Sequence, residues 1–238
     1  MAVPETDLFA TTRWTMVIAA GGSDAAAREK ALADLCGAYW RPIFAYIRRR
    51  GHGVEQAKDL TQEFLGRVLE HDWLAGLTRE GSKFRAFLLV AVRRFLAVEY
   101  ERQTAQKRGG GAVALSLDSV DMAEPTSSDE TPERAFDRRW ALTVIERAAE
   151  RLKAEAAASG RTALFTRVAG YLSTDPEPGA YEAIAFELGM SRPAIAMAVH
   201  RLRLRLREHI RAEVGDTTSS PREIEGEMRE LMAALRGV

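Results

Sequence analysis

Arginine recurs at every second position near the end of the chain, at 201, 203, 205 and 207. Arg201 and Arg205 lie four residues apart, so on a helix they share one face and can neutralise neighbouring phosphates of a nucleic acid. They belong to the second of two short helical patterns, 181–188 and 192–214, which are separated by a tight turn at glycine. This arrangement predicts a helix-turn-helix, whose second helix enters the DNA major groove. An ordinary helical hairpin with a solvated arginine face is the alternative interpretation.

A second polar surface is predicted in the segment 54–71. Asp59, Gln62 and Glu63 are spaced three and four residues apart, so they form one helical face beside the apolar one. Such a face suits binding to basic groups of a partner protein. The alternative is a helix surface that only faces water.

The helical pattern 84–108 combines basic and aromatic side chains. Tyr100 lies among its charges, and Trp73 precedes it in a loop expected at 72–82. Its basic residues are Arg85, Arg93, Arg94, Arg102, Lys107 and Arg108. Cations that meet phosphates, interleaved with rings on which bases stack, are typical of single-stranded DNA binding. The alternative is a core helix whose basic residues face water.

The sequence offers no set of residues that would make a catalytic centre. The four histidines show no metal-ligand spacing, and the glycine run 109–111 lacks the Lys-Ser/Thr pair of a phosphate-binding loop. The one cysteine, Cys36, can form neither an internal disulfide nor a cysteine-based metal cluster, and it lies on an apolar helical face. We therefore expect no catalytic residue, no metal and no cofactor.

The elements that carry these residues have helical periodicity, so we expect an all-α fold. Apolar residues recur at spacings of three and four in the segments 25–50, 54–71, 84–108, 132–159, 161–172, 181–188 and 192–214. Pro42 is expected to kink or split the first helix, because proline lacks the backbone N–H that a helix interior needs. Ser191 is expected to cap the last, since its hydroxyl can accept from the free N–H groups of the first turn.

The stretch that starts at Gly109 divides the chain into two helical blocks. Residues 109–136 carry six acidic side chains and one basic side chain, and large apolar residues are few. We interpret this stretch as a flexible acidic linker. The expected organisation is a helical domain over 12–108, the linker over 109–132, a second helical domain over 133–214 and a tail over 215–238.

The tail is acidic and follows helical spacing. Its apolar positions are Ile224, Met228, Leu231, Met232 and Leu235, with glutamates between them. The pattern predicts an amphipathic helix. Two roles are open: the helix docks on a domain or a partner and masks a DNA-binding surface until released, or it completes the core of the second domain.

The composition excludes a chain that is disordered throughout or inserted in a membrane. The 238 residues are 46% hydrophobic, and 34 basic side chains balance 34 acidic ones. No stretch approaches the roughly 18 uncharged apolar residues that cross a bilayer. No export signal is expected either, so we predict a cytoplasmic protein.

The order of these segments resembles that of a known family. The sequence Asp59-Leu60-Thr61-Gln62-Glu63-Phe64, the basic helix, the acidic linker and the run 200–207 follow one another as in bacterial RNA polymerase sigma factors of the extracytoplasmic-function type. Segments 12–14, 39–42 and 106–111 look like one subgroup of that family. The resemblance covers residues 12–214 and implies two helical domains, called sigma-two and sigma-four, without an intervening third.

The resemblance also implies roles for individual residues. A surface that docks on the clamp helices of the largest polymerase subunit is implied for Asp59, Gln62, Glu63, Phe64 and Arg67. Contact with the melted minus-ten promoter element, where the loop 72–83 would capture a flipped base, is implied for Trp73, Lys83, Arg85, Arg93, Arg94 and Arg102. Contact with the minus-thirty-five element is implied for Ser191, Arg192, Ala194, Met197, Arg201 and Arg203.

Within the minus-thirty-five set, Arg192 is the best candidate for a bidentate contact to guanine. Ala196 and Ala198 stand where family members often carry basic residues. Their presence weakens the expected phosphate binding or shifts recognition towards apolar contact with thymine methyl groups.

The implied function is that of a sigma factor, which binds core RNA polymerase, directs it to promoters and assists promoter melting without covalent chemistry of its own. Its implied partners are core polymerase and promoter DNA, both as duplex and as melted strand, and an anti-sigma factor stays open. The alternative is a dimeric helix-turn-helix regulator that binds duplex DNA independently of polymerase. A helical enzyme or an interaction scaffold is the third interpretation, although the chain offers no residues to nominate for it.

Overall fold

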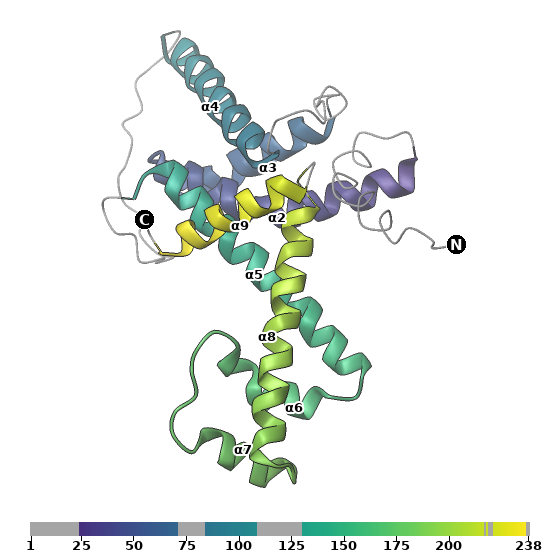
Figure 1. The fold of residues 1–238 in the computed structure, drawn as a ribbon. Helices are drawn as coiled ribbons and strands as arrows, with labels where there is room; N and C mark the ends of the chain where they lie inside the picture. Colours follow the sequence, from purple (N-terminus) through teal and green to yellow (C-terminus); the bar gives the residue numbers. More distant parts are fainter. Residues whose placement is uncertain (1–23, 71–83, 109–129, 217, 219–220, 237–238) are drawn as a thin grey trace. The chain divides into compact units, whose positions relative to one another are not determined.

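The protein is all-helical in the computed structural model, which describes residues 24–70, 84–108, 130–216, 218 and 221–236 (Figure 1). These residues form eight α-helices and one short 3-10 helix, with no strand among them. The helices are α2 (Ala25–Arg49), α3 (Val54–Glu70), α4 (Phe84–Arg108), α5 (Pro132–Ala158), α6 (Thr162–Val168), α7 (Ala180–Leu188), α8 (Arg192–Gly215) and α9 (Pro221–Arg236), and the 3-10 helix η1 is Ala169–Leu172. The expected all-α class is confirmed, whereas most of the expected linker lies outside the described residues.

The contacts divide the chain into two compact units. The first unit is Met1–Thr143 together with Gly215–Val238, and the second is Val144–Val214. Helices α5 and α8 therefore contribute residues to both units. The start of α5 and the tail belong with the first block of helices, which differs from the grouping of residues 133–214 drawn from the sequence.

Helix α2 runs through Pro42 as a single element. The side chain of Asp24 caps its N-terminus by accepting from the N–H groups of Ala26 and Ala27, at 3.1 and 3.3 Å. Proline in a helix interior costs about 3 kcal/mol, because one backbone hydrogen bond is lost. Burial offsets this cost, since the apolar side chains next to Pro42, Tyr39 and Ile43 among them, are almost fully buried. The expectation that Pro42 splits the helix is therefore wrong.

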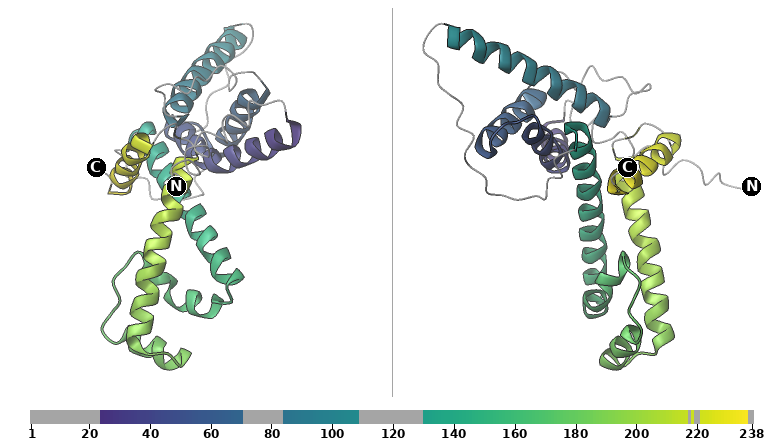
Figure 2. Two further views of the ribbon diagram at one scale, coloured as in Figure 1. Left: turned by 45° about the vertical axis from the view of Figure 1, so that its right-hand side comes forward. Right: turned by 90° about the vertical axis from the view of Figure 1, so that its left-hand side faces the viewer.

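Helices α2, α3 and α4 lie close to one another in the first unit (Figure 2), and aromatic contacts join them in its core. The rings of Tyr39 and Phe84 meet edge to face with centroids 5.3 Å apart, and those of Phe64 and Phe95 lie 5.6 Å apart. Such aromatic pairs add about 0.5–1.5 kcal/mol to the free energy that burial alone supplies. These contacts fix which faces of α3 and α4 remain at the surface.

Ion pairs tie the start of α5 to the same unit. Glu130, just before α5, accepts from Arg49 at the end of α2 at 3.0 Å and from Arg138 on α5 at 2.8 Å. On α4, Arg93 pairs with Glu133 of α5 at 2.9 Å. Residues that the sequence assigned to a separate domain are thus held against α2 and α4.

The second unit is built around α7, the turn at Gly189 and α8, the segments for which the sequence predicts a helix-turn-helix. Its core consists of Val168, Ile184, Ala185, Ile195 and Val199, and a neighbouring cluster consists of Leu152, Ala156 and Phe165. Leu202 packs against both clusters and so joins the end of α5 to α6, α7 and α8. The expected helix 161–172 is divided in the structure, because its last four residues form η1.

Candidate functional site

Helix α3 presents the polar face that its sequence predicts. Asp59, Gln62 and Glu63 are exposed, while Leu60 and Phe64 point into the core. Phe64 has an exposed fraction of 0%, so it lies beneath this face and not on its surface. The role that the resemblance implied for Phe64 is thereby corrected, because a helix of this periodicity buries position 64 when it exposes positions 59, 62 and 63.

Arg67 lies at the edge of this face and is held by two carboxylates. Its Nη2 donates to Glu63 at 2.6 Å and to Glu99 of α4 at 2.8 Å. The guanidinium also lies over the ring of Phe95, 5.0 Å from the centroid. Burial acts to lower the pKa of Arg67, but the hydrogen bonds and charges of Glu99 and Glu63 raise it above its ordinary value.

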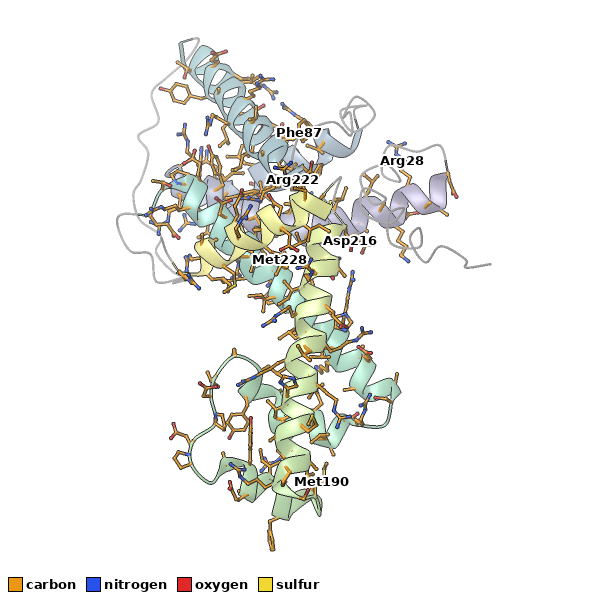
Figure 3. The ribbon with its side chains drawn as sticks, viewed as in Figure 1. Arg28, Phe87, Met190, Asp216, Arg222 and Met228 are labelled. Carbon is orange, nitrogen blue, oxygen red and sulfur yellow. The ribbon has the colours of Figure 1, made fainter. Side chains whose placement is uncertain are left out.

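An apolar groove of about 400 Å³ lies on α4, next to Arg67 of α3. Its lining consists of Arg67, Phe87, Val90, Ala91, Arg94, Phe95 and Val98. Val90 and Val98 are exposed, with relative accessibilities of 47% and 54%. Phe87, which is labelled in Figure 3, also lines the groove. Apolar side chains at the surface beside fixed charges are typical of surfaces that bind proteins. This groove was not predicted, because it needs residues of α3 and α4 together.

The exposed arginines of α4 follow the sequence prediction in part. Arg93, Arg94 and Arg102 are at the surface, and the ring of Tyr100 is 72% exposed. Trp73 and Lys83, which were also assigned to the minus-ten element, lie outside the described residues. The described part of α4 thus combines exposed cations with an exposed ring, which is the combination that single-stranded nucleic acids bind.

Arg85 departs from this group, because it is buried. Its side chain is only 9% exposed and forms ion pairs with Asp137 of α5 and with Glu227 and Glu230 of α9. We call these four residues the Arg85 cluster. The Nε–Oε2 distance to Glu227 is 3.1 Å, and the guanidinium lies 4.5 Å from the centroid of the Trp140 ring. In this structure Arg85 is therefore not at a surface where it could line the path of a DNA strand, which corrects the role implied for it.

Three carboxylates share one guanidinium in the Arg85 cluster, and the pKa values reflect this excess. Burial acts to lower the pKa of Arg85, but the charges of Glu227, Asp137 and Glu230 raise it well above its ordinary value. For Asp137, burial raises the pKa, and the neighbouring glutamates add to this effect, while Arg85 opposes it. Ionisation of Asp137 is thus less favourable than that of an aspartate in water.

The turn between α7 and α8 is built by Gly189 and Ser191. Gly189 adopts φ +62°, a left-handed conformation that side chains disfavour, and the N–H of Met190 donates to the carbonyl of Ala185 at 2.9 Å to close α7. Ser191 then caps α8, because its hydroxyl accepts from the N–H of Ala194 at 3.3 Å. The predicted cap is confirmed, and Figure 3 shows Met190 at this turn.

The residues assigned to the minus-thirty-five element lie on different sides of α8. Met197 and Arg201 are exposed, and Ala194 is half-buried. Arg192 pairs with Glu182 of α7, with its Nε 2.6 Å from the carboxylate. Arg203 points towards the end of η1, where it donates to the carbonyls of Tyr171 and Thr174 at 3.0 and 2.7 Å.

An exposed stripe on α8 includes two residues that the sequence analysis missed. His200 and Leu204 are exposed and lie three and seven residues after Met197. Together with Arg201 they form one outward face of the helix. The spacing from Met197 was the signal that could have identified them.

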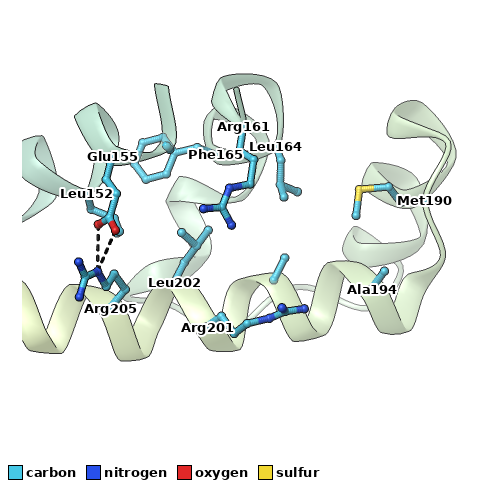
Figure 4. Close-up of a pocket in the computed structure, with 12 residues that line it drawn as sticks. Leu152, Glu155, Arg161, Leu164, Phe165, Met190, Ala194, Arg201, Leu202 and Arg205 are labelled. Atoms are coloured by element: carbon cyan, nitrogen blue, oxygen red, sulfur yellow. Dashed lines mark hydrogen bonds and ion pairs between the residues drawn. The ribbon is translucent and has the colours of Figure 1, made fainter. Parts of the chain in front are cut away.

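A pocket of about 400 Å³ lies within the second unit, between the end of α5, α6 and α8 (Figure 4). Leu152, Phe165 and Leu202 form apolar walls, and Arg201 and Arg205 line it from α8. Glu155 accepts from Arg205 at 3.0 and 3.1 Å and makes a 2.8 Å contact with His209. The hydrogen bonds from Arg205 and His209 lower the pKa of Glu155, so this carboxylate is anionic at neutral pH.

Other kinds of site find little support among the described residues. No group of three or more His, Cys, Asp or Glu side chains in this part of the chain is arranged to hold a metal ion. Burial raises the pKa of the Cys36 thiol, which disfavours the nucleophilic thiolate. None of the described helices is both long and apolar enough to cross a membrane.

Comparison of the chain with models of known families, with characterised proteins and with solved structures found no match. The functional interpretation of the surfaces of α3, α4 and α8 therefore depends on their geometry and on the sequence resemblance.

Proposed function

We propose that this chain is a transcription initiation factor of the sigma type, which acts in the cytoplasm on core RNA polymerase and promoter DNA. The observation that carries the proposal is the exposed Asp59, Gln62 and Glu63 face of α3 beside an apolar groove, in a chain that also has a helix-turn-helix. A dimeric regulator would need a surface that binds its own copy, and a face with two carboxylates is unfavourable against itself because like charges repel.

In this proposal, the α3 face binds basic groups of the largest polymerase subunit. The two exposed carboxylic side chains provide charge complementarity, which gives specificity and a fast association rate. Arg67 is already held by Glu63 and Glu99, so its side chain loses little further conformational entropy when the partner binds.

The exposed face of α4 binds the melted strand. Arg93, Arg94 and Arg102 neutralise phosphates, and the ring of Tyr100 offers a surface on which a base can stack. Stacking of one base on an aromatic side chain contributes about 1–3 kcal/mol. The role of the loop 72–83 in capturing a flipped base remains a prediction from the resemblance.

The duplex upstream is read by α8. Met197, His200 and Arg201 face outward from the helix-turn-helix, and Arg192 at its first turn is the candidate for guanine recognition. The Arg192–Glu182 pair is exposed on both sides, and such surface pairs are worth about 0–1 kcal/mol. A guanine edge can therefore replace Glu182 as the partner of Arg192 at low cost.

Transcription from a pool of genomic fragments tests this proposal. Core polymerase with the chain is expected to start at positions that share one upstream element, while core polymerase alone is not. Arg192→Ala should reduce initiation and relax the sequence at one upstream position, at a cost of about 1–3 kcal/mol for a lost bidentate contact.

Arg167→Ala is the matched control, because it removes one exposed arginine that pairs with Glu187 of α7 and lies on α6, away from the first turn of α8. Tight binding to duplex fragments without polymerase, and no effect on where polymerase starts, would favour the independent regulator.

A further inference from the structure

The buried face of α9 contains a carboxylate at its centre. Ile224, Glu227 and Leu231 follow at spacings of three and four and are only 1–3% exposed. An ionised carboxylate in such a stripe is strongly unfavourable unless a cation and hydrogen bonds compensate for the lost water. The docking of α9 therefore depends on the cation that pairs with Glu227.

That partner is Arg85, near the start of α4. The guanidinium donates to both carboxylate oxygens of Glu227, at 3.1 and 3.4 Å, and also binds Glu230 one turn further along α9. A helix that only completed a core would satisfy the same face with an apolar residue at position 227. The docking of α9 instead depends in part on a cation supplied by the basic helix.

Carboxylates of α5 and α9 bind two of the arginines of α4, in the way that phosphates of a nucleic acid would. Arg85 is bound by residues of α5 and α9, and Arg93, two turns along, is bound by Glu133 of α5. Arg94 and Arg102 on the same helix are exposed. A nucleic acid that followed the arginines of α4 to the start of the helix would compete with these carboxylates for the same guanidinium groups.

We propose that α9 is an intramolecular competitor of single-stranded nucleic acid at α4, so that docking of α9 and full binding of the strand exclude one another. The proposal rests on the proposed function, because it takes α4 as the surface for the melted strand. Release of α9 removes two of the three carboxylates that bind Arg85, so a phosphate can take their place while Asp137 of α5 remains. By linkage, the strand must weaken the docking of α9 by the same factor by which docked α9 weakens binding of the strand.

The first test compares the affinity of two charge-matched variants for a fluorescein-labelled thymidine oligonucleotide of about 12 nucleotides, a length that one binding surface can hold. Glu227→Gln with Glu230→Gln removes two charges from the Arg85 cluster. Glu223→Gln with Glu225→Gln removes two charges from the same helix outside the cluster. We expect the first variant to bind on the order of tenfold more tightly than the unaltered chain, which lies within the usual range of coupling between sites.

The second test uses the unaltered chain and therefore does not depend on the folding of a variant. Hydrogen exchange of the α9 amides is measured with and without the same oligonucleotide. The oligonucleotide is expected to accelerate exchange in α9 and to leave exchange in α7 unchanged.

Two results would overturn the proposal. Equal tightening in both double variants would show an effect of net charge alone, and unchanged α9 exchange on oligonucleotide binding would show that the two events are independent. Either result leaves the proposed function intact if the chain still directs polymerase to promoters. Failure to bind polymerase, with α9 exchange still responding to the oligonucleotide, would instead remove the proposed function alone.

Discussion

At the residue scale, Arg85 shows how burial changes what an arginine does. Arg93 and Arg94, two turns further along α4, are exposed. Arg85 is instead enclosed by three carboxylates and the ring of Trp140. A buried ion pair contributes little net stability when it forms, because both charges lose their water. Removal of one partner is costly, because the other charge stays buried.

Arg85→Ala is therefore expected to lower the free energy of unfolding by about 3–5 kcal/mol, since Glu227 is left buried without its cation. Urea denaturation followed by circular dichroism measures this change. The control is Arg93→Ala, which removes a solvent-exposed pair with Glu133 and should have a much smaller effect. Equal effects of the two substitutions would contradict the structural role of Arg85.

A pH-dependent contribution to stability is expected from Asp137, because burial raises its pKa in the folded state. A carboxyl group with a raised folded pKa stabilises the fold most when protonated, and this contribution is lost as the pH rises through that pKa. Asp137→Asn cannot ionise and should therefore be at least as stable as the unaltered chain at neutral pH. The difference in melting temperature should vanish below about pH 4, where the carboxyl is protonated in both the folded and the unfolded state, and an Asn variant less stable at pH 7 would argue against this account.

At the element scale, the turn of the helix-turn-helix depends on a left-handed glycine. Gly189→Ala should destabilise the second unit by about 1–2 kcal/mol, because φ +62° brings a Cβ too close to the following carbonyl oxygen. The control is Gly226→Ala inside α9, where a Cβ meets nothing within 4 Å. That substitution should stabilise the helix by about 0.5–1 kcal/mol. Thermal unfolding compares the two variants, and a stabilised Gly189→Ala chain would mean that the turn has another conformation.

The helices themselves were largely predictable, because their signals are local. The apolar spacing in 54–71 predicted α3, and the predicted cap at Ser191 marked the start of α8. For α2 the sequence left a kink or a split at Pro42 open, and the split is wrong, since tertiary burial outweighed the cost of one missing hydrogen bond. The shortening of α6 to Thr162–Val168 carried no comparable local signal.

At the scale of the whole molecule, the contacts between distant segments could not be predicted from spacing. Arg85 meets Asp137 52 residues further along the chain and Glu230 145 residues further along. No periodicity relates such positions, so Arg85 was grouped with the exposed arginines of α4. The groove beside Arg67 was missed for the same reason, because α3 and α4 form it jointly.

The central claim is that the α3 face docks on polymerase, and binding of the purified chain to core RNA polymerase from the same organism tests it most directly. The account predicts a tight complex of one chain per polymerase, with binding weakened at least tenfold by Asp59→Ala and by Gln62→Ala, or about 1.4 kcal/mol. Glu150→Ala, which removes an exposed carboxylate from α5, should bind like the unaltered chain. Absence of binding by the unaltered chain, or equal binding by all these variants, would contradict the account.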